Sequence, residues 1–197
     1  MQRYDTRRYS PPRTIRQRNL SILEYALLGL VHQRQPCSGY DIRKIVATTP
    51  MGTFSDSPGA IYPALQRLET GGLLHGRVEE TRAVRRRKLY RLSAKGTAAL
   101  ESWLRRPVER ADVVRGIPEL SLRFAFMEAV LGGEACVAFL QSYVRELASY
   151  VPTLRAHARA QEGSMPRSGR LALSGGIMGY ETQLAWARLA LRSYGRK

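Results

Sequence analysis

Apolar residues recur at helical spacing in three successive segments after residue 19. In the first segment the repeating positions are Leu23, Leu27, Leu30 and Val31, at steps of one, three and four residues. A turn at Pro36 follows, and the second segment carries its apolar stripe on Tyr40, Ile42, Ile45 and Val46. Steps of this size place apolar side chains on one face of a helix, so both segments predict helices that pack against a common core.

The third segment, SPGAIYPALQRLETGGL from Ser57 to Leu73, predicts a helix capped by Ser57 that ends at a pair of glycines. Ile61 and Leu65 belong to the face that we expect to be buried. Pro63 lies in the second turn, where its missing N–H frees the carbonyl group of Gly59. The positions that we expect to face a large partner are Ser57, Gly59, Tyr62, Pro63, Gln66 and Arg67.

Two short runs after the glycines alternate as strands do. They cover residues 73–80 (LLHGRVEE) and 87–93 (RKLYRLS), and TRAVR between them predicts the turn of a hairpin. Ser93 then caps a fourth helix, which Pro107 closes. Three helices, a two-stranded hairpin and a further helix follow the order of a winged helix-turn-helix, whose recognition helix enters a major groove of DNA.

The second half of the chain predicts helices only. After a winged domain over residues 19–106, a polar connector over 107–118 leads into a helical domain over 119–197. Steps of three and four residues alternate along two long segments, which is the pattern of helices that pack along each other. The two seams are Cys136, Leu140, Tyr143, Leu147, Tyr150 and Leu154, then Leu173, Ile177, Tyr180, Leu184, Ala187, Leu191 and Tyr194. The fold class predicted is mainly α, with α+β character in the wing.

The charge balance adds a partner to this picture. The chain has 32 Lys and Arg against 16 Asp and Glu, a formal net charge of +16, and such an excess favours an acidic partner such as nucleic acid. Arg85, Arg86, Arg87 and Lys88 cluster at and just after the hairpin tip, where a wing would meet DNA phosphates. A merely basic composition with solvated cations is the alternative. The exposed face of the third predicted helix and the basic hairpin tip are two independent features on one side of a small fold. Together they favour double-stranded DNA as the partner.

Other chemistries find little support in the residues. His32, His75 and His157 lie in separate elements and form no ligand cluster, and the usual hydrolase and phosphate-loop motifs are missing. The sequence therefore predicts no catalytic residue, no metal site, no cofactor and no enzymatic activity. Cys37 and Cys136 suggest no disulfide framework and fit a reducing cytoplasm. No apolar run reaches the roughly 18 residues that span a bilayer.

Residues 1–18 are rich in arginine and poor in apolar side chains, which predicts a disordered basic arm. Arg7, Arg8, Arg13 and Arg16 could follow the minor groove of DNA. The alternatives are an inert tail and a segment that is foreign to the native protein.

Three stretches resemble the PadR family of bacterial transcriptional regulators. They are Gly39-Tyr40-Asp41, Ser57 through Leu73, and Tyr90-Arg91-Leu92-Ser93 with Gly96, where Ser93 replaces the commoner threonine. The resemblance implies a homodimeric repressor and adds Tyr40 to the residues expected at the DNA. It also implies a dimer made by the C-terminal helices. The seam residues that we assign to that interface are Leu140, Leu147, Leu173, Ile177, Tyr180, Leu184 and Leu191.

Some members of this family bind a small aromatic or drug-like effector near the dimer interface, so the resemblance implies an effector that releases the operator. The candidates to line such a site are Trp103, Phe124, Phe126, Tyr143 and Trp186. Apolar residues at helical spacing more often form plain core, and this alternative stays open. The alternative function is a winged-helix adaptor between proteins that has lost its DNA contacts, against which the basic wing argues.

Overall fold

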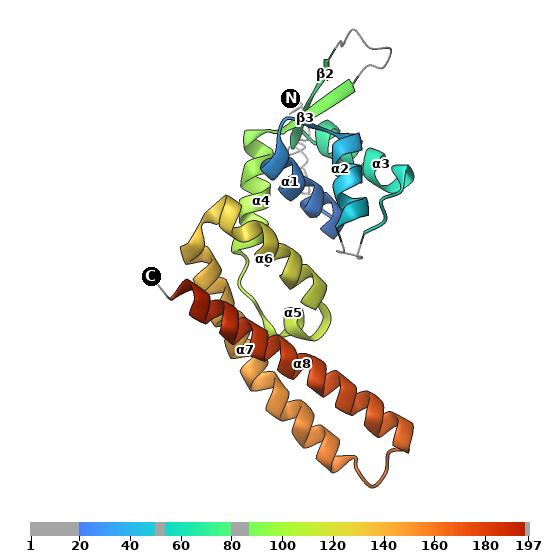
Figure 1. Ribbon diagram of the computed structural model, residues 1–197, viewed down its shortest axis with the longest axis vertical. Coiled ribbons are helices and arrows are strands. Elements are labelled where there is room, and N and C mark those ends of the chain that lie inside the picture. Colours follow the sequence, from blue (N-terminus) through green and yellow to red (C-terminus); the bar gives the residue numbers. More distant parts are fainter. Residues whose placement is uncertain (1–19, 50–53, 80–86, 196–197) are drawn as a thin grey trace, which may run out of the picture.

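The computed structural model of the chain describes residues 20–49, 54–79 and 87–195. The molecule is mainly helical, with a small antiparallel sheet in its N-terminal half (Figure 1). The winged domain forms one end of an elongated molecule, and a hairpin of two long helices forms the other end (Figure 1). The fold class predicted from the sequence is therefore confirmed.

The helices of the winged domain follow the predicted order: α1 (Ile22–Arg34), α2 (Gly39–Thr48), α3 (Pro58–Thr70) and α4 (Ala94–Arg105). Their starts are encoded locally. Ser21 and Glu24 form a capping box at α1, and Ser38 and Asp41 form another at α2. Ser57 occupies the N-cap position of α3 as expected, but its hydroxyl makes no capping hydrogen bond.

The wing consists of β2 (Leu74–Glu79) and β3 (Arg87–Leu92), which pair antiparallel as predicted. A third strand, β1 (Cys37–Ser38), pairs with the other edge of β3 and was not predicted, because two residues are too few to show an alternating pattern. This strand ties the start of α2 to the wing. The predicted turn with Arg85 and Arg86, and the basic arm over 1–18, lie outside the described residues.

One expectation for α2 is wrong. Ile42 is fully buried, but Tyr40, which the sequence placed in the same apolar stripe, is 61% exposed. Two residues correspond to more than half a helical turn, so these side chains point to different sides of the helix. Tyr40 is therefore available at the surface.

The helical half consists of α5 (Arg110–Arg115), α6 (Ile117–Leu131), α7 (Gly133–Ala160) and α8 (Arg167–Tyr194). The short helix α5 lies inside the segment 107–118, which the sequence predicted as a polar connector. The N–H group of Glu109 donates to the carboxylate of Asp112 at 2.9 Å, which stabilises the first turn. Val113 is fully buried, so the segment packs against the helices instead of linking two free domains.

The seams predicted along α7 and α8 do pack helix against helix, and they do so within one chain. Leu140 and Leu147 of α7 are fully buried, and Leu184 and Leu191 of α8 pack against the same core. The two helices run side by side as a long hairpin (Figure 1). No helix within the described ranges is both long enough and apolar enough to cross a membrane.

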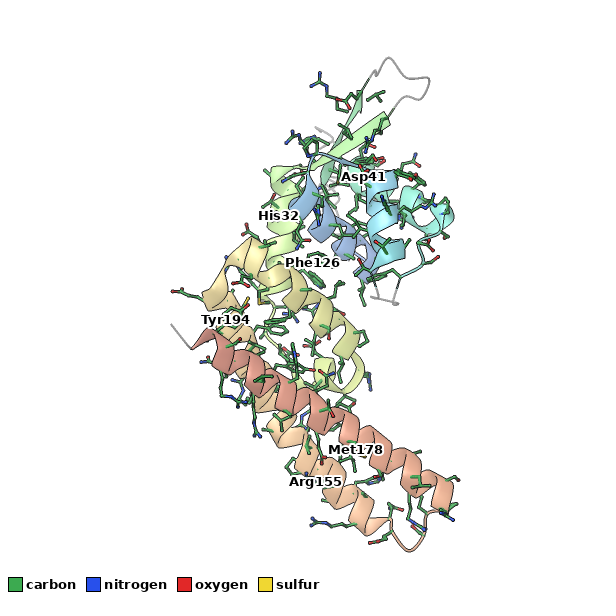
Figure 2. All side chains as sticks on the ribbon, in the orientation of Figure 1. His32, Asp41, Phe126, Arg155, Met178 and Tyr194 are labelled. Atoms are coloured by element: carbon green, nitrogen blue, oxygen red, sulfur yellow. The ribbon has the colours of Figure 1, made fainter. Side chains whose placement is uncertain are left out.

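One hydrophobic core joins the two halves of the molecule. Trp103 of α4 stacks on Tyr25 of α1 with ring centres 4.6 Å apart, and its indole N–H donates to Glu119 of α6 at 3.0 Å. Phe126 of α6 lies against Gly29 of α1, where a Cβ atom would come within 2.7 Å of the phenyl ring. Figure 2 shows Phe126 where α6 meets the winged domain. The winged domain is thus fixed on the helical half.

A buried arginine reinforces the same junction. Arg123 of α6 is only 1% exposed, and its guanidinium donates to the backbone carbonyls of Leu104 and Arg106 at the end of α4. The guanidinium carbon lies 5.4 Å from the ring centre of Phe139. These carbonyls have no partner within the helix, so Arg123 satisfies them from the neighbouring helix.

Gly96 of α4 should be important for the stability of the fold. A Cβ atom at this position would lie 2.0 Å from the carbonyl oxygen of Leu73, so the backbone would have to move. We expect Gly96→Ala to lower the free energy of unfolding by about 1–3 kcal/mol, as overpacking does, measured by urea denaturation. Gly163→Ala is the control, because a Cβ there meets nothing within 4 Å. Equal midpoints for the two variants would contradict this packing.

Candidate nucleic-acid interface

The exposed face of α3 carries the residues that the sequence assigned to a large partner. Ile61 and Leu65 are fully buried, whereas Tyr62 between them is 41% exposed. Among the described residues, a methyl group on Gly59 would meet nothing within 4 Å, so the backbone there is open to close approach from outside. The other exposed positions of this surface are Ser57, Pro63, Gln66 and Arg67.

Helix α3 runs from Pro58 to Thr70 without a break despite Pro63. A proline inside a helix removes one hydrogen bond and costs about 3 kcal/mol. The carbonyl group that loses its partner belongs to Gly59, an exposed residue, so water can take the place of the missing N–H. The proline ring is itself exposed and displaces no core side chain. The buried face of α3 is therefore unaffected by Pro63.

The ring of Tyr62 is held over the start of α2. A Cβ atom on Gly39 would lie 2.6 Å from Cε1 of Tyr62, so only glycine leaves room for the ring in this position. Gly39 is buried, and the next residue, Tyr40, is exposed. The ring thus packs on one side and faces solvent on the other. This contact gives a physical reason for the glycine of the Gly39-Tyr40-Asp41 motif.

Three cations of this surface are already paired with acids of the same domain. The pairs are Arg67–Glu24, Arg87–Asp41 and Lys88–Glu69, with N···O distances of 3.0, 2.5 and 2.6 Å. The cationic side chains remain 41–49% exposed, so their other N–H groups can still reach a partner. Each pair fixes the direction of a long side chain that would otherwise sample many rotamers.

Asp41 links α2 to the wing. Its carboxylate accepts hydrogen bonds from the N–H and the hydroxyl of Ser38, at 2.9 and 2.8 Å, and from Arg87 of β3. Burial acts to raise the pKa of Asp41, but the hydrogen bonds from Ser38 and Arg87 outweigh it and the pKa is lowered. Asp41 therefore stays ionised beside the base of the wing (Figure 2).

Lys88 is held from two sides. Its Nζ atom lies 2.6 Å from Oε2 of Glu69 and 5.7 Å from the ring centre of Tyr90. The hydrogen bond from Lys88 to Glu69 raises the pKa of the lysine, so Lys88 is charged at neutral pH. Lys88 thus presents a fixed positive charge between α3 and the wing.

The sequence indicated these cations but not the acids that hold them. The paired residues are 19, 43 and 46 positions apart, so no periodic spacing connects them. Asp41 and Glu69 both belong to the stretches that resemble the family, Gly39-Tyr40-Asp41 and Ser57 through Leu73. Acids in the same small domain as a basic wing are the signal that could have indicated these ion pairs. Glu24 was expected only as part of a capping box, which it forms.

The five aromatic residues predicted to line an effector site do not share one space. Phe124, Tyr143 and Trp186 come together between α6, α7 and α8, with Trp186 centred 5.5 Å from Phe124 and 6.4 Å from Tyr143. Trp103 of α4 is buried against Tyr25 of α1, and Phe126 of α6 also lies against α1. Trp103 and Phe126 therefore lie apart from the other three aromatic residues, and the effector site itself stays a prediction.

A cavity of about 250 Å³ opens between α1, α2 and α6. Its lining is mostly aliphatic and aromatic and includes Leu30, Val46 and Phe126, with Arg34 among the few polar residues. Phe126 is the one predicted effector residue that lines it. The sequence did not indicate this cavity, because its residues belong to ordinary apolar stripes and only their packing leaves a gap.

The residues predicted for a subunit interface lie along the contact between α7 and α8. Leu140 and Leu147 are fully buried within the chain, and their assignment to a subunit interface stays a prediction. The remaining positions are half-buried on the inner side of α8: Leu173, Ile177, Tyr180, Leu184 and Leu191. The apolar positions of the seam are covered because α8 folds back along α7 of the same chain.

Several solved structures are similar to this chain. Bacillus subtilis PadR in complex with operator DNA has 21% identity over 89% of this chain and 99% of its own, with a TM-score of 0.43. A PadR-like transcriptional regulator from Bacillus cereus has 22% identity over 90% and 98%, with a TM-score of 0.40. Bacillus subtilis PadR in complex with p-coumaric acid has 20% identity over 89% and 100%, with a TM-score of 0.39. No curated protein matches the chain.

The match to a protein family falls on the winged domain. Residues 27–102 match the model of the transcriptional regulator PadR-like family. This segment contains the whole of α2, α3 and the sheet, and therefore the exposed face of α3 and the paired cations described above. The family is one of transcriptional regulators and not of enzymes. Over residues 27–102 the chain is therefore similar to the PadR-like family of transcriptional regulators.

Proposed function

We propose that the chain is a homodimeric repressor that binds double-stranded DNA in the cytoplasm and releases it when a small molecule binds. The observation that carries this proposal is the exposed face of α3, where Tyr62, Pro63 and the open backbone of Gly59 lie in the same domain as the paired cations of the wing. Within the described part of the chain a Cβ atom on Gly59 would meet nothing within 4 Å, so packing there does not require the glycine.

In the proposed complex, α3 of each protomer enters a major groove. The N–H group of Gly59 in its first turn and the hydroxyl of Ser57, which makes no capping hydrogen bond, suit a phosphate oxygen. The Tyr62 hydroxyl can donate to another phosphate. Arg87 and Lys88 at the start of β3 point their charges at the flanking backbone, and the net charge of +16 favours the approach of DNA.

The homodimer is supported by a second apolar stripe on α8. Leu171, Met178 and Leu189 are 63%, 63% and 60% exposed, and they lie on the side of α8 away from the seam with α7. A methyl group on Gly175 or Gly179 would meet nothing within 4 Å. No helix in the described ranges makes the close approach that these glycines suggest. A second copy related by a two-fold axis would supply it.

The effector is supported by the cavity between α1, α2 and α6. Two of these helices belong to the winged domain and one to the helical half, so a molecule bound there can change the angle between the two parts. The apolar lining with Arg34 among its few polar groups suits a small apolar molecule with one negative charge. Such a molecule would shift the spacing of the two α3 helices in a dimer.

Tyr62→Ala and Gly59→Ala test the role of α3. Each should weaken binding to a duplex that the wild-type protein selects from random-sequence DNA by about 1–3 kcal/mol, because one loses a contact and the other blocks close approach. Thermal unfolding should hardly change, since both sites are exposed.

Gly163→Ala is the matched control, with an equally open methyl group in the α7–α8 turn. Retained affinity in both α3 variants would contradict the proposed docking. If the wild-type protein selects no duplex at all, the adaptor function is favoured instead.

Met178→Glu tests the stripe of α8. A charge buried in a subunit interface is expensive, so we expect the dimer to weaken by about 2 kcal/mol or more, measured by sedimentation equilibrium. Ala156→Glu adds the same charge at an exposed site on α7 and should leave the dimer intact. A Met178→Glu protein that is as dimeric as this control would show that the interface lies elsewhere.

A further inference from the structure

An acid at the end of α3 reaches the wing across the gap that a missing side chain, at Gly76, leaves on the face of the sheet. Glu69 lies in the last turn of α3, and its carboxylate pairs with Lys88 of β3 at 2.6 Å. Strand β2 lies at the edge of the sheet, beside β3. Gly76 of β2 sits at the crossing point, because a Cβ atom there would lie 2.4 Å from Oε1 of Glu69 and 2.3 Å from Cε of Lys88. The missing side chain therefore makes room for the ion pair.

The pair connects a buried anchor to an exposed charge. Tyr90, two residues after Lys88 on the same face of β3, is only 7% exposed, and the lysine ammonium lies over its ring. Glu69 holds the ammonium from the side of α3, and its own side chain is 27% exposed. The lysine is thus fixed by the core below it and by the recognition helix beside it.

Simple electrostatics predicts that Glu69 should harm DNA binding. It is a negative charge in a domain that has to approach phosphates, and it neutralises a lysine of the wing. An exposed ion pair of this kind contributes only about 0–1 kcal/mol to stability, so stability is a weak reason to place an acid there. Holding a flexible lysine in one direction is a larger effect, because a free lysine side chain has about 2 kcal/mol of rotamer entropy to lose on binding.

We propose that Glu69 is a positioning residue for DNA binding: it holds Lys88 through the gap at Gly76, so that the wing and α3 present their contacts in one fixed arrangement. An acidic side chain then raises the affinity for DNA. This inference rests on the proposed function and deepens it, because it names a residue that sets the geometry of the interface without touching the DNA.

Removing the charge of Glu69 should lower the affinity for DNA if the proposal is correct, and should raise it if Glu69 only repels phosphates. Glu69→Gln should lower the affinity for the duplex selected by the wild-type protein by about three- to tenfold, measured by fluorescence anisotropy. Glu79→Gln is the control, since Glu79 lies on β2, is exposed and forms no ion pair with any residue in the described ranges. This control removes the same charge from the same winged domain and should leave the affinity unchanged or raise it.

Gly76→Ala breaks the pair without changing any charge. The two groups in its way are ends of flexible side chains, which can move aside while the strand stays in place. We expect the same loss of affinity as for Glu69→Gln, with the unfolding temperature little changed. In a Lys88→Gln background, Glu69→Gln should have no further effect on affinity, because the residue that it positions is gone.

Three results would overturn the proposal: a Glu69→Gln protein that binds as tightly as the Glu79→Gln control, a Gly76→Ala protein with wild-type affinity, or an undiminished effect of Glu69→Gln without Lys88. Each can be observed only if the wild-type protein binds the selected duplex. A wild-type protein that binds no duplex would overturn the proposed function itself, so the two failures are distinguishable.

Discussion

Burial of Ile61, Leu65 and Leu68 fixes the rotation of α3, and every surface feature of the winged domain depends on that rotation. A leucine or isoleucine that is fully buried contributes about 1.5–3 kcal/mol, so three of them offset the roughly 3 kcal/mol that an interior proline costs. With this face held in the core, Tyr62 and Pro63 have no other direction than outward. The proline then stiffens the exposed side of the helix, and its ring faces outward.

The cations around this face act together with acids. Each of the three ion pairs is too exposed to add much to the free energy of folding. Their effect is on direction: Asp41 ties β3 to the start of α2, and Glu69 ties it to the end of α3. The wing is therefore held to the helices on both sides through its own basic residues. A surface that would otherwise consist of mobile charges becomes one with a defined shape.

The winged domain and the helical half are not independent bodies. Trp103, Phe126 and Arg123 connect α1, α4 and α6 by stacking, close packing and backbone hydrogen bonds. Any change at this junction alters the direction of the long hairpin of α7 and α8 relative to α3. If the free stripe of α8 joins two copies, the spacing of the two recognition helices depends on the same junction. The cavity beside Phe126 lies where a ligand would act on it.

Much of the fold follows from local sequence. The helices of the winged domain, the hairpin and the two long helices are encoded by caps, glycine stops and apolar periodicity, which act over a few residues. The same periodicity determined which face of α3 is buried, and therefore which residues are exposed. The family motifs contained Gly39 and Gly96, although only the structure gives the reasons for them: the ring of Tyr62 and the carbonyl of Leu73 occupy the space of a side chain.

What the sequence could not determine is which surfaces meet. The strand β1 was too short to be seen, and the helix α5 was taken as part of a connector. The apolar seams of α7 and α8 were correct as packing faces, yet a heptad-like pattern is the same for a partner in the same chain and for one in another chain. Likewise, Glu69 and Lys88 meet only because the sheet brings a glycine between them. Periodicity records the direction of a side chain, and only the tertiary structure decides what lies there.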